Sequence, residues 1–361
     1  MILSVIIVSY NTSELTLQTI KSCLTEINDS NLLKSKTEII VVDNNSSDAS
    51  IKTIKQLLST IHIPLSLIQN KNNNGFAKAN NQGIKKATGK YILLLNSDTI
   101  VRPHALERLV KAMDKFEDDE TTAYLSSYHG QLDRLGILAA SLLNPDGSSQ
   151  PQGGSFPNLI SLSSHMLLLD DIPIIGKWLP STQHTGRRNP KSLPRQQAGE
   201  IRNPKQARKA KVSNLKNSDL KFVSSFDIRA SNLICKSWVA ATAMLVKREV
   251  FDEIGLLDEN IFMYGEDVEF CLRANQHLWD IAIHPNAQIV HYGSASSSSK
   301  NAIIGELKGY QYIWSKHKPL WQLPILKLIL KTGISLRVLL FATIARNREK
   351  LNIYQEAARQ L

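Results

Sequence analysis

Short apolar runs alternate with amphipathic segments along residues 1–125. Continuous β-branched and aliphatic runs favour strands that are covered on both faces, and they occur at residues 4–9, 38–43, 65–69 and 91–95. Apolar residues at helical spacing predict helices between these strands, at residues 15–27, 49–58, 76–87 and 103–116, with N-cap chemistry at residues 11–14. This alternation predicts an α/β fold with a doubly wound sheet that is parallel at its centre and flanked by helices.

The second half of the chain is less regular. We expect a turn at residues 143–147 and a helix at residues 158–170. Further along, the pattern predicts one buried strand at 238–246, helices at 248–254 and 267–276, and two short strands at 281–283 and 288–291. No internal repeat is visible.

A C-terminal helical tail follows, and its residues 323–344 are strongly apolar. Helical spacing puts Lys327, Lys331 and Arg337 on one side of this segment. The segment is long enough to span a bilayer, but three interior cations make spanning costly. We therefore expect an amphipathic helix in the membrane interface, with Trp314 and Trp321 at the boundary. The alternative is a helix that packs on the main domain or in a dimer.

Composition and charge limit the possible partners. The 361 residues are 42% hydrophobic, so disorder as the dominant state is excluded. Of the net charge of +11, residues 181–221 carry +9, with eleven basic and two acidic residues. This segment has almost no apolar residues, so we expect a mobile insert that is either a plain solvated loop or attracted to anionic lipid or a pyrophosphate-bearing acceptor. It has no interleaved aromatics, which disfavours nucleic acid.

Missing sequence motifs exclude further classes of protein and indicate a cellular compartment. There is no GxGxxG and no Walker A sequence, as dinucleotide oxidoreductases and P-loop ATPases would require. The three cysteines match no zinc or disulfide spacing, which indicates a reducing compartment. The N-terminus lacks the basic region of a signal peptide, so we expect the N-terminal half to fold in the cytoplasm.

Acidic residues follow two of the predicted strands. Asp43 and Asp98 stand at carboxyl ends, where α/β sheets bind ligands, so they can converge on one crevice. Asp98 could be an oxygen ligand for Mg²⁺ or Mn²⁺, or it could cap the next helix through an Asx turn. His291 could complete a metal site if it faces Asp98; otherwise it is a structural histidine.

Two further segments have both a structural and a functional interpretation. Glu266, Asp267 and Glu269 crowd the start of a helix. They could complement the helix dipole, or their mutual repulsion could raise one pKa and create a general base. The turn before the helix at 76–87 contains Gly75, and its backbone N–H groups suit phosphate.

Six of these segments, in this order, resemble family 2 glycosyltransferases of the GT-A fold, especially the rhamnosyltransferase-like branch. The segments are SVIIVSYN (4–11), VVDNNSSD (41–48), NGFAKANNQG (74–83), LNSDT (95–99), MYGEDVE (263–269) and VH (290–291). The resemblance covers roughly residues 1–125 and 235–300.

The resemblance implies roles for individual residues. Asp98 matches the last acid of the metal-binding Asp-x-Asp motif, whose first position here is Asn96, and His291 matches a further ligand of the Mg²⁺ or Mn²⁺ ion. Asp267 matches the general base, with Glu266 beside it. Glu266 and Trp238 match positions near the acceptor. The implied donor-binding set is Ser9, Asn11, Asp43, Asn74, Gly75, Asn96 and Asp98.

The resemblance also implies a division of the chain. We expect a nucleotide-sugar-binding half at residues 1–125, an acceptor-side segment at 126–180, the basic insert at 181–221, a catalytic and acceptor half at 222–300, and C-terminal amphipathic helices at 301–361.

The implied activity is an inverting transfer of a sugar from a nucleotide-diphosphate sugar, such as dTDP-rhamnose or a UDP-sugar. The acceptor would be a hydroxyl of a cell-surface polysaccharide or lipid-linked glycan, and the enzyme would lie peripherally on the inner face of the cell membrane. Two alternatives are a sugar nucleotidyltransferase and a basic membrane- or nucleic-acid-binding protein on an inactive fold. The first requires a Gly-rich triphosphate loop, which residues 9–12 do not offer.

Overall fold

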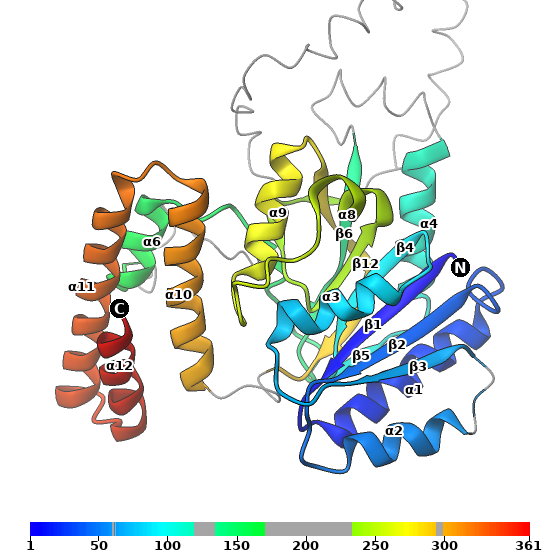
Figure 1. Cartoon of the computed structure of the whole chain (residues 1–361). Coiled ribbons are helices and arrows are strands. Elements are labelled where there is room, and N and C mark those ends of the chain that lie inside the picture. The colour runs from blue at the N-terminus through cyan, green and yellow to red at the C-terminus, as the bar shows by residue number, and fades with distance from the viewer. Residues whose placement is uncertain (60, 62, 119–133, 170–232, 294–298) are drawn as a thin grey trace, which may run out of the picture.

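The computed structural model describes residues 1–59, 61, 63–118, 134–169, 233–293 and 299–361. An α/β domain built on one large sheet lies beside a group of helices that includes the C-terminus (Figure 1). The basic segment 181–221, predicted as a mobile insert, lies outside the described residues.

The large sheet is mixed but mostly parallel, as the sequence predicts. Its order is β3 (Leu65–Gln69), β2 (Thr37–Asp43), β1 (Leu3–Ser9), β4 (Tyr91–Asn96), β11 (Ala243–Lys247), β6 (Leu135–Leu143), β12 (Asp280–His291) and β5 (Thr99–Val101). The first four strands are parallel, and β12 is parallel to β6. The antiparallel strand β11 joins these two groups, and β5 is an antiparallel edge. The sequence analysis missed β6.

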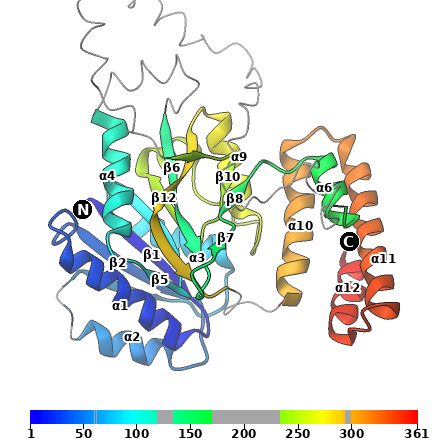
Figure 2. The ribbon, with the colours of Figure 1, turned by 180° about the vertical axis from the view of Figure 1, so that it is seen from behind.

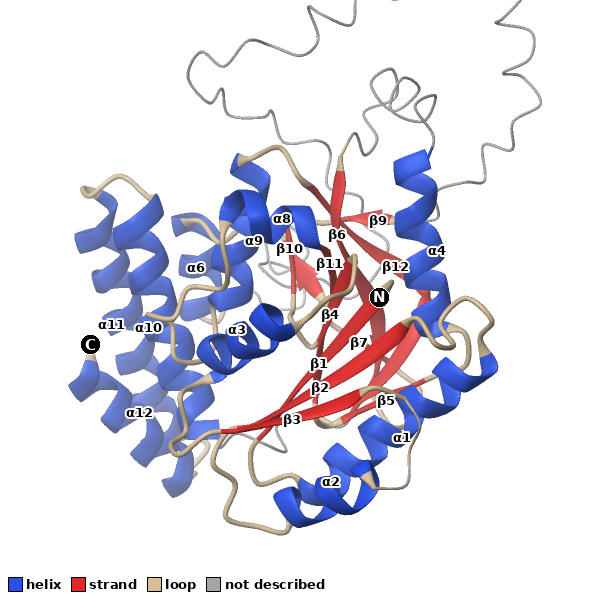
Figure 3. Cartoon of the chain, turned by 45° about the vertical axis from the view of Figure 1, so that its right-hand side comes forward, coloured by secondary structure: helices blue, strands red, loops and turns tan. Residues whose placement is uncertain are grey.

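Helices cover both faces of the sheet (Figure 3). Side chains alternate along β1, so Val5 and Ile7 pack in one core and Ile6 in the other. The first core includes α1 (Ser13–Asp29), α2 (Ser50–Leu58) and α4 (Ala105–Asp118). The second includes α3 (Phe76–Lys86), α8 (Arg248–Ile254) and α9 (Glu266–Gln276).

Two predicted strand boundaries are wrong. The predicted strand at 238–246 is two strands, because β10 (Trp238–Val239) pairs with β8 (Gly153–Gly154) in a small separate sheet, whereas β11 belongs to the large sheet. Conversely, the predicted strands at 281–283 and 288–291 are one strand, β12, whose register shifts after His284. Local hydrophobic patterns do not encode which sheet a strand joins.

The C-terminal segment forms α10 (Ser299–His317), α11 (Gln322–Thr343) and α12 (Arg348–Gln360), which lie near α6 (Leu159–Met166) (Figure 2). The buried face of α11 includes Leu326, Leu330 and Ile334, and α11 contacts all three of the other helices. The helix therefore packs on other helices of this group, and its packing on the sheet domain or in a dimer stays a prediction. Among the described residues, no helix has the length and apolar character of a membrane span.

The prediction that three cations share one side of α11 is wrong for Arg337. Lys327 and Lys331 are exposed, whereas Arg337 is buried and donates hydrogen bonds to the carbonyl oxygens of His165 and Met166. Those carbonyls lie at the C-terminal end of α6, where backbone acceptors lack helical partners and the dipole is negative. The guanidinium of Arg337 therefore links α11 to α6 through these hydrogen bonds.

Candidate active site

The carboxyl ends of three parallel strands bring the predicted donor-side residues together. Ser9 of β1 is in register with Asp43 of β2, and Val8 is in register with Asn96 of β4. The hydroxyls of Thr12 and Ser97 lie 3.0 Å apart across these ends. Asp43 and Asn96 therefore border one edge of the sheet, where α/β folds bind ligands.

The turn after β4 brings Asp98 opposite His291. Strand β5 follows this turn and pairs with β12 so that Thr99 is in register with His291, and the Tyr292 N–H donates to the Asp98 carbonyl oxygen at 2.9 Å. As a result, Nε2 of His291 lies 3.3 Å from Oδ1 of Asp98. Two residues that are 193 positions apart in the sequence thus share one site.

The Asp98–His291 pair fits a divalent cation. Oδ1 of Asp98 is buried and makes no hydrogen bond with the described residues, and the same holds for Oδ1 of Asn96. Neighbouring ligands of an octahedral ion at about 2.1 Å lie roughly 3 Å apart, which matches the distance between Oδ1 and Nε2. In the described part of the chain, no three His, Cys, Asp or Glu side chains gather as a metal site. An ion held by Asp98 and His291 would need its other ligands from substrate oxygens and water.

A short backbone segment connects this pair to the acidic start of α9. The Ala241 N–H lies 3.4 Å from Oδ2 of Asp267, and the carbonyl oxygen of Thr242 accepts a hydrogen bond from the Asn96 N–H at 3.0 Å. Asp267 and the strand end that leads to Asp98 are thus held by adjacent residues. These two contacts also use the backbone between β10 and β11, where the predicted single strand is interrupted.

Burial raises the pKa values of both Glu266 and Asp267, and the charge of Asp267 adds to the shift at Glu266. Oδ1 of Asp267 accepts a hydrogen bond from the Val268 N–H at 2.8 Å, which favours the carboxylate form. Asp267 is partly exposed, whereas Glu266 is buried and its Oε2 makes no hydrogen bond with the described residues. Asp267 is therefore the member of the pair better placed to hold charge and meet a substrate.

Four of the predicted site residues have an unsatisfied buried oxygen atom, as do Ser30, Ser50, Gln152 and Ser164 elsewhere. A buried side-chain oxygen without a hydrogen bond to the described residues occurs in Asp43, Asn96, Asp98 and Glu266. Each such group costs about 1–3 kcal/mol, so native folds keep few of them and often for function. These oxygens are candidate ligand contacts.

Asn44 organises the donor-side loop, and the sequence analysis missed it. Its Oδ1 accepts hydrogen bonds from the Asn74 N–H at 3.0 Å and from Asn70 Nδ2 at 3.1 Å, and its Nδ2 donates to Asn73 Oδ1 at 2.8 Å. The sequence signal that could have found it is its position directly after Asp43, the last residue of β2. The loop in turn contacts the segment before α9, because the Phe76 N–H donates to the Phe262 carbonyl oxygen at 2.7 Å.

Gly75 occupies a position that excludes a side chain. Its φ is 82°, and a Cβ there would lie 2.5 Å from the Phe262 carbonyl oxygen. Its N–H donates to Asn73 Oδ1 at 3.0 Å. Because Gly75 has no side chain, the loop that contains it can contact the backbone at Phe262, in the segment before α9.

The remaining predicted residues lie in different environments. Ser9 is buried, with its hydroxyl 2.9 Å from that of Thr16. Asn11 has a φ of 53°, and its Oδ1 accepts a hydrogen bond from the Ser47 N–H at 2.7 Å. Trp238 is only 8% exposed and its indole N–H donates to the Ser155 carbonyl oxygen, so its proposed contact with an acceptor stays a prediction.

The predicted N-cap at residues 11–14 is formed differently from the expectation. Thr12 occupies the N-cap position of α1 but makes no side-chain capping hydrogen bond. Oδ2 of Asp48, from the neighbouring loop, accepts instead from the Ser13 N–H at 2.9 Å. Side chains from a distant loop can satisfy a helix end, which a local sequence pattern does not reveal.

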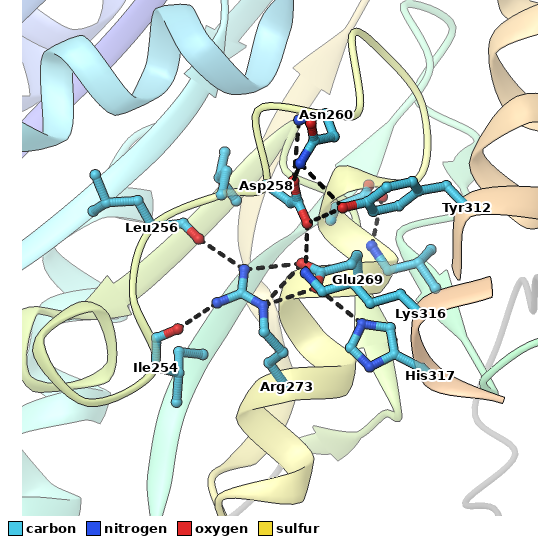
Figure 4. Close-up of polar contacts among 12 residues, drawn as sticks. Ile254, Leu256, Asp258, Asn260, Glu269, Arg273, Tyr312, Lys316 and His317 are labelled. Carbon is cyan, nitrogen blue, oxygen red and sulfur yellow. Dashed lines mark hydrogen bonds and ion pairs between the residues drawn. The ribbon is translucent and has the colours of Figure 1, made fainter. Parts of the chain in front are cut away.

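A cluster of paired charges anchors the other side of α9 (Figure 4). Glu269 is fully buried and contacts Arg273 at 2.9 Å, Lys316 at 2.8 Å and His317 at 3.0 Å. Burial by itself raises the pKa of Glu269, but hydrogen bonds from His317, Arg273 and Lys316 outweigh it and lower the pKa to about 2. The cluster joins α9 to α10.

Comparison with known proteins identifies the class. The fold is that of GT-A glycosyltransferases: the solved structure of GalNAc-T7 with UDP, GalNAc and Mn²⁺ aligns over 96% of this chain and 57% of that chain, with a TM-score of 0.52 and 16% identity. A mannosyltransferase from Pyrobaculum calidifontis, solved with GDP-Man and Mn²⁺, aligns over 99% of this chain and 85% of its own, with a TM-score of 0.48 and 14% identity.

The sequence comparisons are more specific. Residues 4–135 match the family model "Glycosyl transferase family 2". The N-acetylglucosaminyl-diphospho-decaprenol L-rhamnosyltransferase of Mycobacterium tuberculosis (strain CDC 1551 / Oshkosh) is 21% identical over 265 residues, which are 72% of this chain and 67% of that protein. Over residues 4–135 the chain thus matches family 2 glycosyltransferases, which supports the resemblance noted in its motifs.

Proposed function

We propose that this glycosyltransferase moves a sugar from a nucleotide-diphosphate sugar to a hydroxyl of a lipid-linked glycan, with inversion and with help from a divalent metal. The observation that carries the proposal is the contact of Asp98 with His291, together with the backbone at residues 241–242, which contacts both Asp267 and the neighbouring Asn96. The mycobacterial relative named above, whose name specifies rhamnose and a diphospho-decaprenol acceptor, supports dTDP-rhamnose as the first donor to test.

The N-terminal half, residues 1–125, would bind the donor. Asp43 and Asn96 offer their free oxygens at the strand ends, and Ser9 and Asn11 border the same edge. The loop of Asn74 and Gly75, held by Asn44, would lie along the nucleotide. Residues 126–180 and 222–300 would form the acceptor side.

Asp98 and His291 would hold Mg²⁺ or Mn²⁺. A bound ion of this kind supplies positive charge that stabilises a leaving diphosphate. The residues of the chain contribute a carboxylate oxygen and an imidazole nitrogen that are already turned toward each other. With Asn96 in place of a second acid, the site carries only one negative charge from this motif.

Asp267 would act as the general base. Its carboxylate takes the proton from the acceptor hydroxyl as that oxygen forms a bond to the anomeric carbon. The bond between the anomeric carbon and the diphosphate oxygen breaks with its electron pair leaving on the nucleoside diphosphate. Attack opposite the leaving group inverts the anomeric centre. A raised pKa strengthens Asp267 as a base near neutral pH, and Glu266 beside it would contact the acceptor.

The α11 helix would place the enzyme on the inner face of the cell membrane. Its side away from the protein core carries exposed apolar residues at helical spacing, namely Trp321, Ile325, Leu328, Leu336 and Leu339. Residues 299–361 contain eleven Lys and Arg but three Asp and Glu, which favours an anionic lipid surface. In vesicle sedimentation, Leu328→Ser with Leu339→Ser should lose binding to anionic vesicles. Wild-type protein that ignores such vesicles would refute this placement.

A donor screen tests the activity. With Mn²⁺ present, nucleotide sugars are scored by nucleoside diphosphate release and by protection against thermal unfolding. Asp98→Ala should lose the Mn²⁺-dependent part of donor binding in calorimetry while keeping its fold. If Asp98→Ala binds and turns over donor with the same Mn²⁺ response as wild type, the assigned metal site is wrong.

A further inference from the structure

A chain of polar side chains lies behind His291, at the turn between β6 and β7 (Ser149–Gln150). The turn is tight: the Asn144 N–H donates to the Ser148 carbonyl oxygen at 2.8 Å, and Gly147 has a φ of 85°. Side-chain hydrogen bonds then run without a break from Asp146 through Ser148, Asn144 and Gln150 to His291. Nothing in the donor- or acceptor-binding roles above uses this chain.

Each hydrogen bond in this series from Asp146 to His291, called the relay below, has a fixed direction. Asp146 only accepts, because the hydroxyl and N–H of Ser148 hold its pKa below the ordinary value and keep it a carboxylate. The Ser148 hydroxyl donates to Asp146 at 2.6 Å, so Ser148 Oγ accepts from Asn144 Nδ2 at 2.8 Å. Oδ1 of Asn144 therefore faces Gln150, whose Nε2 donates to it at 2.9 Å.

The relay ends on one particular tautomer of His291. With Gln150 Nε2 used as a donor, its Oε1 faces His291 Nδ1 at 2.7 Å and can only accept. Nδ1 must carry the hydrogen, which leaves a lone pair on Nε2 of the neutral ring. That nitrogen is the atom 3.3 Å from Asp98 Oδ1.

We propose that Gln150 is a positioning residue for the metal site: it holds His291 as the Nδ1–H tautomer, so that Nε2 is a ready ligand beside Asp98. The proposal rests on the metal dependence proposed above. Hydrogen bonds to the distal nitrogen of a ligating histidine fix its tautomer and orientation and raise its affinity for metal.

Tautomers are measured in the metal-free, full-length protein labelled with ¹⁵N-histidine, at a pH well above the ordinary histidine pKa. Two-bond ¹⁵N–¹H spectra, with His291→Asn to assign the signal, should find hydrogen on Nδ1 of His291. Gln150→Met, which removes the acceptor, should shift the population toward Nε2–H. His284 on the same strand is the internal control: its Nδ1 accepts from the N–H groups of Asn286 and Ala287, so it should stay Nε2–H in both proteins.

Calorimetry with Mn²⁺ alone supplies the second measurement. Gln150→Met should bind Mn²⁺ about 10- to 100-fold more weakly. Gln150→Glu loses the donor to Asn144 but keeps an acceptor oxygen for His291 Nδ1, so it should bind Mn²⁺ more tightly than Gln150→Met. Wild-type His291 found as Nε2–H, or Gln150→Met with a wild-type tautomer and Mn²⁺ affinity, would overturn the proposal.

The two measurements also separate this proposal from the proposed function. If the wild-type tautomer is as expected but neither Mn²⁺ binding nor sugar transfer is found, the function fails and the relay stands. If transfer depends on Mn²⁺ but Gln150→Met changes neither measurement, the relay fails and the function stands.

Discussion

At the start of α9, a pair of acidic residues and a single acidic residue have opposite electrostatic environments. Glu266 and Asp267 are neighbours that form no ion pair with a described cation, and burial raises both pKa values. Glu269 is equally buried, yet Arg273, Lys316 and His317 surround it, and its pKa falls to about 2. One helix therefore carries the proposed reactive pair, Glu266 and Asp267, on one side and a neutralised anchor, Glu269, on the other. The ion pairs of Glu269 can stabilise the helix against the unfavourable burial of Glu266 and Asp267.

The most severe test removes the charge of the reactive pair. Asp267→Asn should lower turnover by about two to four orders of magnitude, because a general base contributes about that much. Donor binding, followed by thermal protection, should stay close to wild type. A variant with near-normal turnover would remove Asp267 from the role of base and would leave the pair without a chemical purpose.

Breaking the anchor should instead reduce stability. Glu269→Leu leaves the partly buried Arg273 without its carboxylate, while the exposed Lys316 keeps Asp258. The loss of this pair should lower the free energy of unfolding by about 3 kcal/mol. Denaturant titration measures this loss. The control is Glu356→Gln, which breaks the exposed ion pair with Lys300 and should leave the free energy of unfolding close to that of wild type. Equal losses in the two variants would show that the buried Glu269 stabilises the fold no more than the exposed Glu356.

The two groups should also respond differently to pH. The folded pKa of Glu269 is depressed, so its stabilisation is complete above the ordinary glutamate pKa and is lost as the pH falls from about 4.5 towards about 2. Thermal unfolding of wild type should therefore show a steep acid-side decline that Glu269→Leu lacks. An unchanged acid profile in that variant would show that the anchor does not govern acid stability.

The smallest effect is expected from relieving the reactive pair. The folded pKa of Glu266 is raised, so its contribution favours the fold below the ordinary pKa and turns unfavourable as pH rises through the folded value. Glu266→Gln should therefore increase the free energy of unfolding at pH 8 by about 1 kcal/mol, and the gain should vanish near pH 5. A destabilised variant at pH 8 would indicate that Glu266 is not strained.

The sequence determined the parts of the molecule whose information is local. Strands β1 to β4 and the helices between them follow from continuous apolar runs and helical spacing, and the position of an acid directly after a strand places Asp43 and Asp98 at the sheet edge. The motifs carried the family resemblance, which the family model supports over residues 4–135.

Tertiary structure alone decided how these parts meet. Only the pairing of β5 with β12 turns His291 toward Asp98, and only the division of residues 238–246 between two sheets frees the backbone that contacts Asp267. Glu266 and Glu269 are the same residue type three positions apart. The cations that distinguish them include Lys316 and His317, which are almost 50 positions away, and long-range charge pairing leaves no local sequence pattern.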